Sequence, residues 1–583
     1  MALKSINVSN TSIATARREN LVYVDKTMFI PQIESGAGSN AIVFLRPRRF
    51  GKTFLADTLD CYYDKSLSGK FDANFEGTWI HSHKTPKASS YCCLRFDFSP
   101  VLPDTSLVEE SFARRIALGI MAFSRRYPSL SLSKDEIKSN LHLPPSELIS
   151  LFLSTFALQA ENGEKIYLII DEYDHFANDI LSNNAEAFVN ITSTAQNHKG
   201  FIKSFYAALK QYFGQDDDSK PIAKFFITGV SAVSLDSLTS GFNIATNISD
   251  LPGFNSMVGF THDELSKIVD EAVDFSVLKP LTKAELMDVM EKNFDGYVFS
   301  KYSRERIFNT TMCLSFLNRL ILTRSVQDVY KNNNLNDDAG KIKGIMKLAP
   351  ADVQQKITEC VFKRESIPAE EPGTLNLNAS REFSEYQVIW MLAYLGYLTI
   401  EPAGETPRSM LNYRCPNEAI YRTFVACISA PGDKEISGAP ALGQSLQKGD
   451  IAELVTEVEK SVASLPSAAF SGFNERSLQL RFYYLIIQSP FTGSLEPILE
   501  ADTGDHGRAD LYVKNSSGGP DMLFEFKYLS KTKANDQAVA SEKAVAKEQL
   551  SRYCNSPKFK GKKNLEAWAV VFAGPKAAAV ERV

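Results

Sequence analysis

The sequence lacks several features that would assign it to common classes of protein. No apolar run approaches the roughly 18 residues that a membrane-spanning helix needs, and the N-terminus has no continuous apolar core of a secretory signal. The eight cysteines form no CxxC pair and no Cys/His zinc spacing. Neither a GxSxG motif nor a Ser/His/Asp motif occurs. We therefore expect an intracellular protein, cytoplasmic or nuclear, with reduced thiols and no membrane partner.

Length and composition limit how the chain is organised. A chain of 583 residues is too long for one hydrophobic core, which predicts three or four domains. Its 44% hydrophobic and 23% charged residues are ordinary for a globular protein. The net charge of −5 excludes a uniformly basic nucleic-acid coat, although local basic patches can be hidden in this average.

The pattern of apolar runs predicts an α/β fold in three parts. In residues 1–260, short apolar runs alternate with helical patterns, which is typical of a buried parallel sheet. Residues 261–430 are mostly helical, and a helix-plus-hairpin pattern from Ser384 to Cys415 predicts a winged-helix-like unit. A final α/β domain is predicted at 446–583, after a boundary rich in Gly, Pro, Ser and Ala. The predicted strands of the first part are Ala41–Leu45, Leu94–Phe98, Ile166–Ile170 and Phe225–Thr228.

A phosphate-binding loop is predicted directly after the first strand. The triplet Gly51-Lys-Thr53 opens a predicted helix, where backbone N–H groups hold phosphate, the lysine reaches the β and γ phosphates and the hydroxyl holds Mg²⁺. Arg46 stands where this motif normally has its first glycine. The candidate nucleotide-binding residues are Arg46, Pro47, Arg48, Arg49, Phe50, Gly51, Lys52, Thr53 and Thr228. Thr228 ends a strand, and an ordinary polar strand end explains it as well as a contact to the γ-phosphate does.

An acidic strand end strengthens the prediction of a P-loop nucleotide site. Asp171 follows the apolar run Ile166–Ile170 and can bind Mg²⁺ together with Thr53. Glu172 can act as the catalytic base that orients an attacking water. The alternative is that both carboxylates only cap the helix that follows. Their order and distance from the Gly-Lys-Thr triplet favour a site for ATP and Mg²⁺.

A second group of candidate catalytic residues lies near the C-terminus. Residues two apart on a strand face the same way, so Glu525 and Lys527 project together from the predicted strand Met522–Tyr528. Asp510, on a neighbouring predicted strand, can complete a cluster of two carboxylates and one ammonium. Asp510 and Glu525 are suited to hold Mg²⁺, and Lys527 to position the nucleophile or stabilise charge, in phosphodiester hydrolysis.

Further residues support this nuclease prediction. Glu475 begins a predicted helix, and Gln549 and Tyr553 share one face of another helix because they lie four residues apart. Between Lys527 and Lys563, basic residues outnumber acidic ones by seven (nine Lys and one Arg against three acids). Such a segment can neutralise phosphates of a nucleic acid, although a solvated helix with a basic tail is an alternative explanation.

The sequence resembles AAA-ATPase-like proteins that carry a PD-(D/E)xK nuclease domain. The resemblance spans most of the chain and implies a P-loop NTPase sheet, a restriction-endonuclease-like α/β domain, and ATP and Mg²⁺ as cofactors. It also implies that Arg46 in place of glycine is a family trait, with the arginines of the loop available to phosphate or to an acidic partner. The matching stretches are Tyr23–Thr27, Arg46–Thr53, Ile170–Asp174, Ile227–Ser231, Gly259–Thr261, Tyr394–Thr399 and Pro416–Glu418.

These observations lead to one main hypothesis and to alternatives. The main hypothesis is an ATP-binding and ATP-hydrolysing module that controls a Mg²⁺-dependent nuclease in the same chain, acting on DNA in preference to RNA. One alternative is a nucleotide-gated protein that binds nucleic acid without cleaving it, and another is an effector or defence protein. The sequence leaves open the manner of cleavage, the rate of ATP hydrolysis and assembly into a homo-oligomer.

Overall fold

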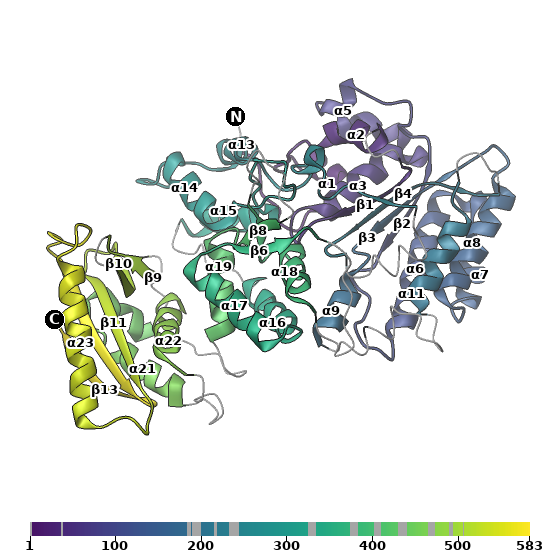
Figure 1. Ribbon diagram of the computed structural model, residues 1–583. Coiled ribbons are helices and arrows are strands. Elements are labelled where there is room, and N and C mark those ends of the chain that lie inside the picture. The colour runs from purple at the N-terminus through teal and green to yellow at the C-terminus, as the bar shows by residue number, and fades with distance from the viewer. Residues whose placement is uncertain are drawn as a thin grey trace. The chain divides into compact units, whose positions relative to one another are not determined.

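The computed structural model forms two compact units, which are described separately (Figure 1). The first comprises Met1–Arg324, Gly344–Gln355 and Ser366–Glu418, and the second Ser325–Lys343, Lys356–Glu365 and Ala419–Val583. The predicted domain division at residues 260 and 430 stays a prediction. In the structure, residues 261–324 group with the N-terminal sheet. The structure describes residues 3–35, 39–183, 188, 200–214, 219–232, 244–324, 334–372, 383–401, 410–429, 440–463, 473–488, 494–504 and 507–583.

A five-stranded parallel sheet forms the centre of the first unit, as the apolar runs predict. Its strands lie in the order β2-β3-β4-β1-β5, and all neighbouring pairs are parallel. Residues in β1, β3 and β4 are buried throughout, because the sheet is covered on both faces. The strands are β1 (Ala41–Leu45), β2 (Cys92–Asp97), β3 (Ile166–Asp171), β4 (Ile222–Gly229) and β5 (Thr246–Asn247).

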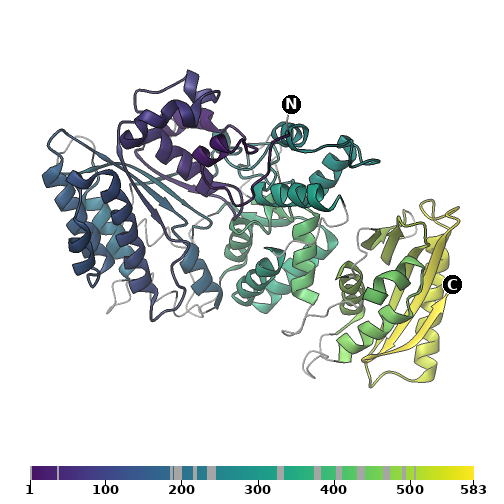
Figure 2. The same cartoon turned by 180° about the vertical axis from the view of Figure 1, so that it is seen from behind.

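Neighbouring residues of β2 identify the helices on the two faces. Arg95 forms an ion pair with Asp57 of α3 (Lys52–Tyr63). The next residue, Phe96, packs against Phe205 of α11 (Phe201–Gln211). Since successive side chains of a strand point to opposite faces, α3 covers one face and α11 the other. Figures 1 and 2 show α11 grouped with α6 (Val108–Arg126) and α8 (Pro145–Gln159).

The sheet brings three sequence-predicted positions to one edge. The carboxyl ends of parallel strands meet at the same edge, so Leu45, Asp171 and Thr228 lie near one another in the fold. Because β4 lies between β1 and β3, Thr228 stands between the loop after β1 and the acidic end of β3. This edge is where a ligand is expected in an open α/β sheet.

Helices predicted for the middle region are present in the first unit. Thr261 and Thr282 each form a capping box with the glutamate three residues later, which explains where α13 (His262–Ala272) and α14 (Lys283–Phe294) begin. Asn309 caps α15 (Thr310–Thr323) by accepting a hydrogen bond from the backbone N–H of Met312. The shorter elements before the middle region are α1 (Ile13–Arg18), α2 (Ile30–Ser35), α4 (Phe71–Phe75), α5 (Trp79–Ser82), α7 (Lys134–Ser139) and α9 (His175–Asn183).

A small antiparallel sheet follows in the order β6-β8-β7. The helix-plus-hairpin prediction is confirmed by α18 (Glu385–Tyr394), β7 (Thr399–Ile400) and β8 (Met410–Arg414). The stretch Ile367–Gly373 is rich in proline, glycine and glutamate, and from sequence alone it is predicted to be a linker or exposed loop. This prediction is wrong for its first four residues, which form β6 (Ile367–Glu370). Pro368 is tolerated because β6 lies at the edge of the sheet. Its missing N–H therefore interrupts no hydrogen bonds to a second neighbouring strand.

The second unit contains a mixed five-stranded sheet with helices on both faces (Figures 1 and 2). Its strand order is β13-β12-β11-β10-β9, and only β11 and β12 are parallel. The parallel connection runs through α23 (Asp536–Cys554), as a crossover requires. The strands are β9 (Leu495–Asp502), β10 (Arg508–Asn515), β11 (Asp521–Leu529), β12 (Leu565–Ala573) and β13 (Lys576–Arg582). The described helices after α15 that have not yet been named are α16 (Asn334–Lys347), α17 (Ala351–Lys363), α19 (Glu418–Ser429), α20 (Pro440–Gln447), α21 (Ala452–Ala463) and α22 (Glu475–Gln488).

Alternation along β11 separates its two faces. Phe524 and Phe526 pack against Phe482 of α22. Leu523 belongs to the same buried cluster as Leu550 of α23. The α23 face therefore also carries the residues two and four positions after Leu523, which are the predicted catalytic Glu525 and Lys527.

Candidate functional site

The phosphate loop has the backbone geometry of an anion site at a helix N-terminus. Gly51 is the N-cap of α3 and has a φ of 96°, a left-handed value that a side chain disfavours. Lys52 and Thr53 are the first two residues of the helix, so their backbone N–H groups have no partner within it. Such N–H groups, together with the helix dipole, favour a bound phosphate.

Lys52 is buried and contacts protein oxygens. Its Nζ donates to the backbone oxygens of Arg46 at 3.0 Å and Pro47 at 3.2 Å. It also lies 3.1 Å from Oε1 of Glu172. The loop after β1 and the end of β3 are thus joined through one ammonium group, and a phosphate that reached Lys52 would compete with Glu172 for it.

Asp171 is fully buried beside Thr53. Burial, reinforced by the neighbouring Glu172, raises the pKa of Asp171 to about 6, against the opposing influence of Arg95, Lys52 and a hydrogen bond with Thr53. Among the described residues, its Oδ1 has no hydrogen-bond partner. A hydroxyl and a carboxylate with a spare oxygen fit the oxygen ligands that Mg²⁺ prefers.

Other buried polar atoms near this edge also lack partners in the described part of the chain. They are Oγ1 of Thr228, which is completely buried, and Oε2 of Glu172. Buried polar groups are normally hydrogen-bonded, and an exception indicates a ligand, water or ion. Together with Asp171, these atoms fit a phosphate and its cation better than a purely structural strand end.

A cavity of about 240 Å³ extends from the phosphate loop. Its walls include Lys52 and Thr53 at one side, and Tyr23 and Phe260 from segments distant in the sequence. It is large enough for a ring system next to the phosphate-binding groups. The cavity therefore has room for part of a bound nucleotide beside the phosphate loop.

The structure does not bring the Arg46 side chain to this cavity. Its guanidinium is buried and donates to the backbone oxygens of Leu45, Ser249 and Phe254 at 2.7–2.8 Å. It also lies over the rings of Phe44 and Phe299. Arg46 thus joins the end of β1 to distant segments, and the predicted contact of this guanidinium with phosphate is not supported.

The remaining loop residues divide between packing and the cavity. Phe50 is buried and packs edge-on against Tyr297 and Phe299. Arg48 forms an ion pair with Asp179 at 3.2 Å and is not among the residues that line the phosphate-loop cavity. Arg49, with a φ of 73°, lines the phosphate-loop cavity. Of the three arginines, only Arg49 is among the described residues that line the phosphate-loop cavity. It is therefore the arginine of the loop that lies near the expected phosphate. Pro47 contributes its carbonyl to Lys52.

Arg95 is a residue of this site that sequence reasoning missed. It lies 3.5 Å from Oδ2 of Asp171 and 3.7 Å from Oδ1 of Asp57, and it donates to the backbone oxygen of Thr53 at 3.4 Å. It therefore links the two predicted Mg²⁺ ligands. The available signal was an arginine inside the otherwise apolar strand Cys92–Asp97.

The predicted carboxylate–lysine cluster is assembled in the second unit. Glu525 is almost completely buried, and its Oε1 accepts a hydrogen bond from Nζ of Lys527 at 3.1 Å. Burial raises the pKa of Glu525, opposed by Lys527. Burial disfavours the charged form of Lys527, but Glu525 and Glu475 outweigh it and raise its pKa. The ammonium therefore stays charged at neutral pH.

The cluster also contains Glu475 and Asp510. Oε2 of Glu475 lies 3.7 Å from Nζ of Lys527. Asp510 accepts hydrogen bonds from the backbone N–H of Phe526 at 2.7 Å and from Nε2 of Gln479 at 2.7 Å. Gln479 was missed by sequence reasoning, because its role depends on α22 packing beside β10. It holds one oxygen of a carboxylate that is predicted to bind metal.

A further oxygen is available in this cluster. Oε2 of Glu525 is buried and has no hydrogen-bond partner among the described residues. Its neighbour across the ladder on β12 is Ala569, which contributes no polar atom. A buried carboxylate oxygen beside a second carboxylate fits a hard cation such as Mg²⁺.

Gln549 and Tyr553 lie together on α23, as their spacing predicts. They share one face of the helix, and Tyr553 is buried. Burial raises the pKa of Tyr553, with smaller contributions from Glu525 and Asp510, which shows that the three groups are near one another. Gln549 and Tyr553 therefore belong to the same cluster as the carboxylates.

Part of the basic segment is neutralised within the unit. Lys543 and Lys547 pair with Glu581, and Lys562 pairs with Asp521. The remaining basic side chains form no ion pair with the described residues of the chain; they include Lys531, Lys533, Lys560, Lys563 and Arg552. The positive segment is consequently smaller than its sequence count indicates.

One further cluster of possible metal ligands among the described residues is occupied by an arginine. Asp60, Asp64 and Cys93 lie close together, but Arg126 forms ion pairs with both carboxylates. His506 lies outside the described residues. None of the seven described cysteines is in a disulfide bond, and none of the described helices is long and apolar enough to cross a membrane.

Comparisons with known proteins identify two domains in this chain. Residues 8–239 match the family model of a predicted AAA-ATPase, and residues 474–582 match that of the PD-(D/E)XK nuclease superfamily. An uncharacterized protein in the vnfD 5' region of Azotobacter chroococcum mcd 1 is 24% identical over 548 residues, which cover 92% of this chain and 91% of that protein. The Drosophila ORC bound to DNA aligns at 10% identity and a TM-score of 0.25, over 73% of this chain and 94% of that chain, which is too low to carry an argument. The family matches confirm the resemblance identified from the motifs.

Proposed function

Since residues 8–239 form an AAA-ATPase-like domain and residues 474–582 a PD-(D/E)XK nuclease-superfamily domain, we propose that this chain is an ATP-controlled, Mg²⁺-dependent nuclease. Its substrate is nucleic acid, DNA in preference to RNA. The observation that carries the proposal is the cluster of the buried Glu525 and Lys527 with the half-buried Asp510, in which Oε2 of Glu525 has no partner among the described residues.

Within the nuclease site, each side chain has a distinct role. Asp510 and Glu525 would hold Mg²⁺, which when bound supplies charge neutralisation and an activated water for phosphodiester hydrolysis. Lys527 stabilises negative charge on the scissile phosphate, and Glu475 holds its ammonium from the other side. Gln479 keeps Asp510 in one orientation. Gln549 and Tyr553 donate hydrogen bonds near the carboxylates and border the substrate.

In the nucleotide site, Lys52 binds the phosphates of ATP, and Thr53 and Asp171 hold its Mg²⁺. Thr228 contacts the γ-phosphate, and Glu172 orients the attacking water. The contact between Lys52 and Glu172 supports a rearrangement of these side chains when ATP binds. The Lys52 ammonium cannot pair fully with a phosphate and with the Glu172 carboxylate at the same time. Release of Glu172 frees this base when ATP arrives. This exchange would make Glu172 available for ATP hydrolysis, while the proposed control of cleavage rests on the presence of both domains in one chain.

The decisive experiment measures cleavage of single- and double-stranded DNA and RNA by the full chain in Mg²⁺, with and without ATP. The variant Glu525→Gln removes a metal-binding charge while preserving shape, and should lower cleavage by about 1,000-fold. Glu566→Gln on the neighbouring strand β12 is the matched control and should cleave normally.

The outcomes separate the proposal from its alternative. Cleavage of any of these substrates that Glu525→Gln abolishes supports the nuclease. Binding of nucleic acid that depends on ATP, without cleavage by the wild type, would favour a nucleotide-gated binding protein. Equal cleavage by wild type and Glu525→Gln would refute the site assignment.

A further inference from the structure

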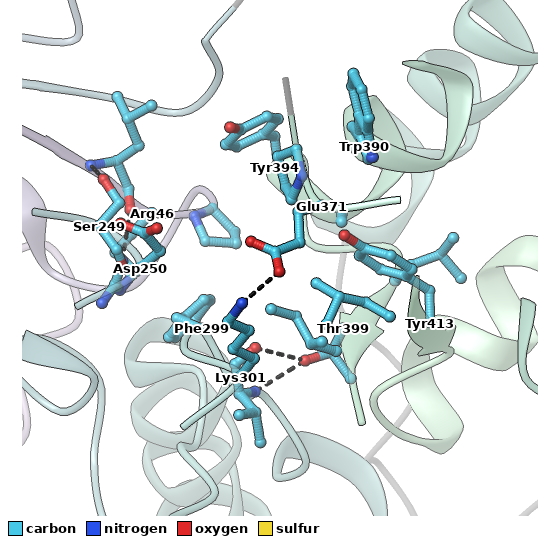
Figure 3. A pocket seen from close by; sticks show the side chains of 18 of the residues that line it. Arg46, Ser249, Asp250, Phe299, Lys301, Glu371, Trp390, Tyr394, Thr399 and Tyr413 are labelled. Carbon is cyan, nitrogen blue, oxygen red and sulfur yellow. Dashed lines mark hydrogen bonds and ion pairs between the residues drawn. The ribbon is translucent and has the colours of Figure 1, made fainter. Parts of the chain in front are cut away.

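A second cavity in the first unit is separate from the phosphate-loop cavity. It has a volume of about 190 Å³ and lies between the end of β1, the 298–302 segment, and α18 with β7 and β8. The two cavities share none of their lining residues. We call it the aromatic cavity, after its lining residues Phe299, Trp390, Tyr394 and Tyr413 (Figure 3).

The aromatic walls are held in place by their surroundings. Nε1 of Trp390 donates to the backbone oxygen of Glu370 at 2.9 Å, which fixes the indole. Phe299 is held against the guanidinium of Arg46 and the ring of Phe50. Preformed aromatic walls favour a flat ligand, because rings stack with little loss of conformational entropy. A cavity of about 150 Å³ already holds one benzene ring, so this one has room for a small ring system and not for a nucleoside triphosphate.

One hydroxyl group in the wall lacks a partner. Tyr413 is completely buried, and its hydroxyl has no hydrogen-bond partner among the described residues. Figure 3 shows this hydroxyl on the side of the ring that faces Glu371 and the cavity. An unsatisfied buried hydroxyl is costly, and it is a group that a polar ligand would satisfy.

The charged side chains that line the aromatic cavity have a net charge of zero. Arg46 and Lys301 are cationic, and Asp250 and Glu371 are anionic. Burial lowers the pKa of Arg46 to about 9, so it remains charged at neutral pH. Lys301 and Glu371 form an ion pair. Two positive and two negative groups favour a neutral ligand over a phosphate, a metal ion or a cationic amine.

The two carboxylates also determine whether the ligand must present hydrogen-bond donors or acceptors to them. Ionised carboxylates only accept hydrogen bonds, and Asp250 and Glu371 both lie toward solvent. A ligand that reaches them must present N–H donors on its outer edge, while its inner edge meets the Tyr413 hydroxyl. A planar nitrogen ring with an exocyclic amino group combines these features.

We propose that the aromatic cavity is a second small-molecule site, which takes a neutral, planar nitrogen heterocycle of nucleobase size that carries an amino donor. The site adjoins the phosphate loop, because Arg46 and Pro47 line it. It does not depend on nuclease activity or on ATP hydrolysis, and its test measures binding alone.

The test is isothermal titration of the full chain with adenine, and with purine as the matched ligand that lacks the amino group. Adenine should bind saturably, and purine about tenfold more weakly because one hydrogen bond to a carboxylate is lost. Tyr413→Phe should weaken adenine binding by about tenfold without lowering the melting temperature of the free protein, since the lost hydroxyl has no partner. Ala393→Phe, which fills the cavity from α18, should abolish binding.

Two results would overturn the proposal. One is the absence of adenine binding at millimolar concentration. The other is adenine binding that neither Tyr413→Phe nor Ala393→Phe changes, because these residues line the aromatic cavity and not the phosphate-loop cavity. Equal affinity for adenine and purine would refute recognition of the amino donor.

Discussion

Both candidate sites contain a buried lysine 3.1 Å from a glutamate, but the two pairs are built differently. Lys52 and Glu172 belong to different elements, the start of α3 and the residue after β3. Lys527 and Glu525 are two residues apart on β11. The first pair can separate when the loop or strand end moves, whereas the second is fixed by the pleat of one strand. The first arrangement suits a contact that a ligand replaces, and the second suits a preorganised catalytic centre.

The surroundings of the two pairs support this difference. Glu172 has a φ of 53°, a value that residues with side chains rarely adopt and that ligand sites often contain. Glu525 lies within strand β11, where it pairs with Ala569 of β12. A change at Lys52 should therefore alter regulation, and a change at Lys527 should alter chemistry.

The largest expected effect comes from removing each lysine separately. Lys527→Ala should lower nucleic-acid cleavage by about 1,000-fold and leave ATP affinity unchanged, because it removes only the charge beside Glu525. Lys52→Ala should lower ATP affinity by about 100-fold and make cleavage insensitive to ATP. Nucleotide titration and a cleavage assay on both variants check this.

Lys514→Ala is the control for these substitutions. It removes an exposed lysine from β10 and should change neither measurement. Equal loss of ATP-independent cleavage in Lys52→Ala and Lys527→Ala would contradict the distinction between a replaceable and a fixed pair.

A smaller effect is expected from Gln479→Ala. Its amide holds Oδ1 of Asp510, and loss of a group that orients a metal ligand typically weakens metal affinity by about 10- to 100-fold. Cleavage measured against Mg²⁺ concentration should shift to higher Mg²⁺ and recover at saturation. A loss of cleavage that no Mg²⁺ concentration restores would show that Gln479 acts on the reaction itself.

The smallest expected effect is on the stability of the folded protein, which should depend on pH through Asp171 of the nucleotide site. The pKa of Asp171 is raised from 3.8 to about 6, chiefly by burial. The folded state therefore binds the proton more tightly than the unfolded state, and this stabilisation is present below about pH 4 and lost as pH rises through about 6. Above that pH, the charged carboxylate costs the free protein at most about 3 kcal/mol.

Asp171→Asn should remove that cost. The nucleotide-free variant should melt several degrees above wild type at pH 7.5, and the difference should shrink toward pH 5, while Mg²⁺-dependent ATP binding is lost. Thermal melts across this pH range provide the measurement. A variant that melts below wild type at pH 7.5 would show that pairing with Arg95 outweighs burial.

Particular elements show how far the sequence could predict the fold. The apolar run Ala41–Leu45 coincides with β1, and the predicted helix at Glu475 coincides with the start of α22. Both depend on local patterns. The segment 367–370 was misjudged because proline and glutamate are typical of loops, and only pairing with β8 makes it a strand.

The residues of the candidate sites also fall into two groups, those that spacing along the chain predicts and those that it does not. The alternation of Glu525 and Lys527 on one strand, and the Gly-Lys-Thr triplet before a helix, can be recognised from spacing alone. The roles of Arg95 and Gln479 could not be predicted, because each contacts a carboxylate on another element.

The sequence by itself determined the two domain types, the phosphate loop and the carboxylate–lysine strand, because these depend on residues that are close along the chain. Only the tertiary structure decided which arginine of the loop remains near the cavity. Arg46 turns inward because carbonyls of Ser249 and Phe254, about 200 residues away, receive its hydrogen bonds. The aromatic cavity likewise exists only because α18 and the small sheet pack beside the end of β1. Long-range packing selects side-chain directions that local spacing leaves open.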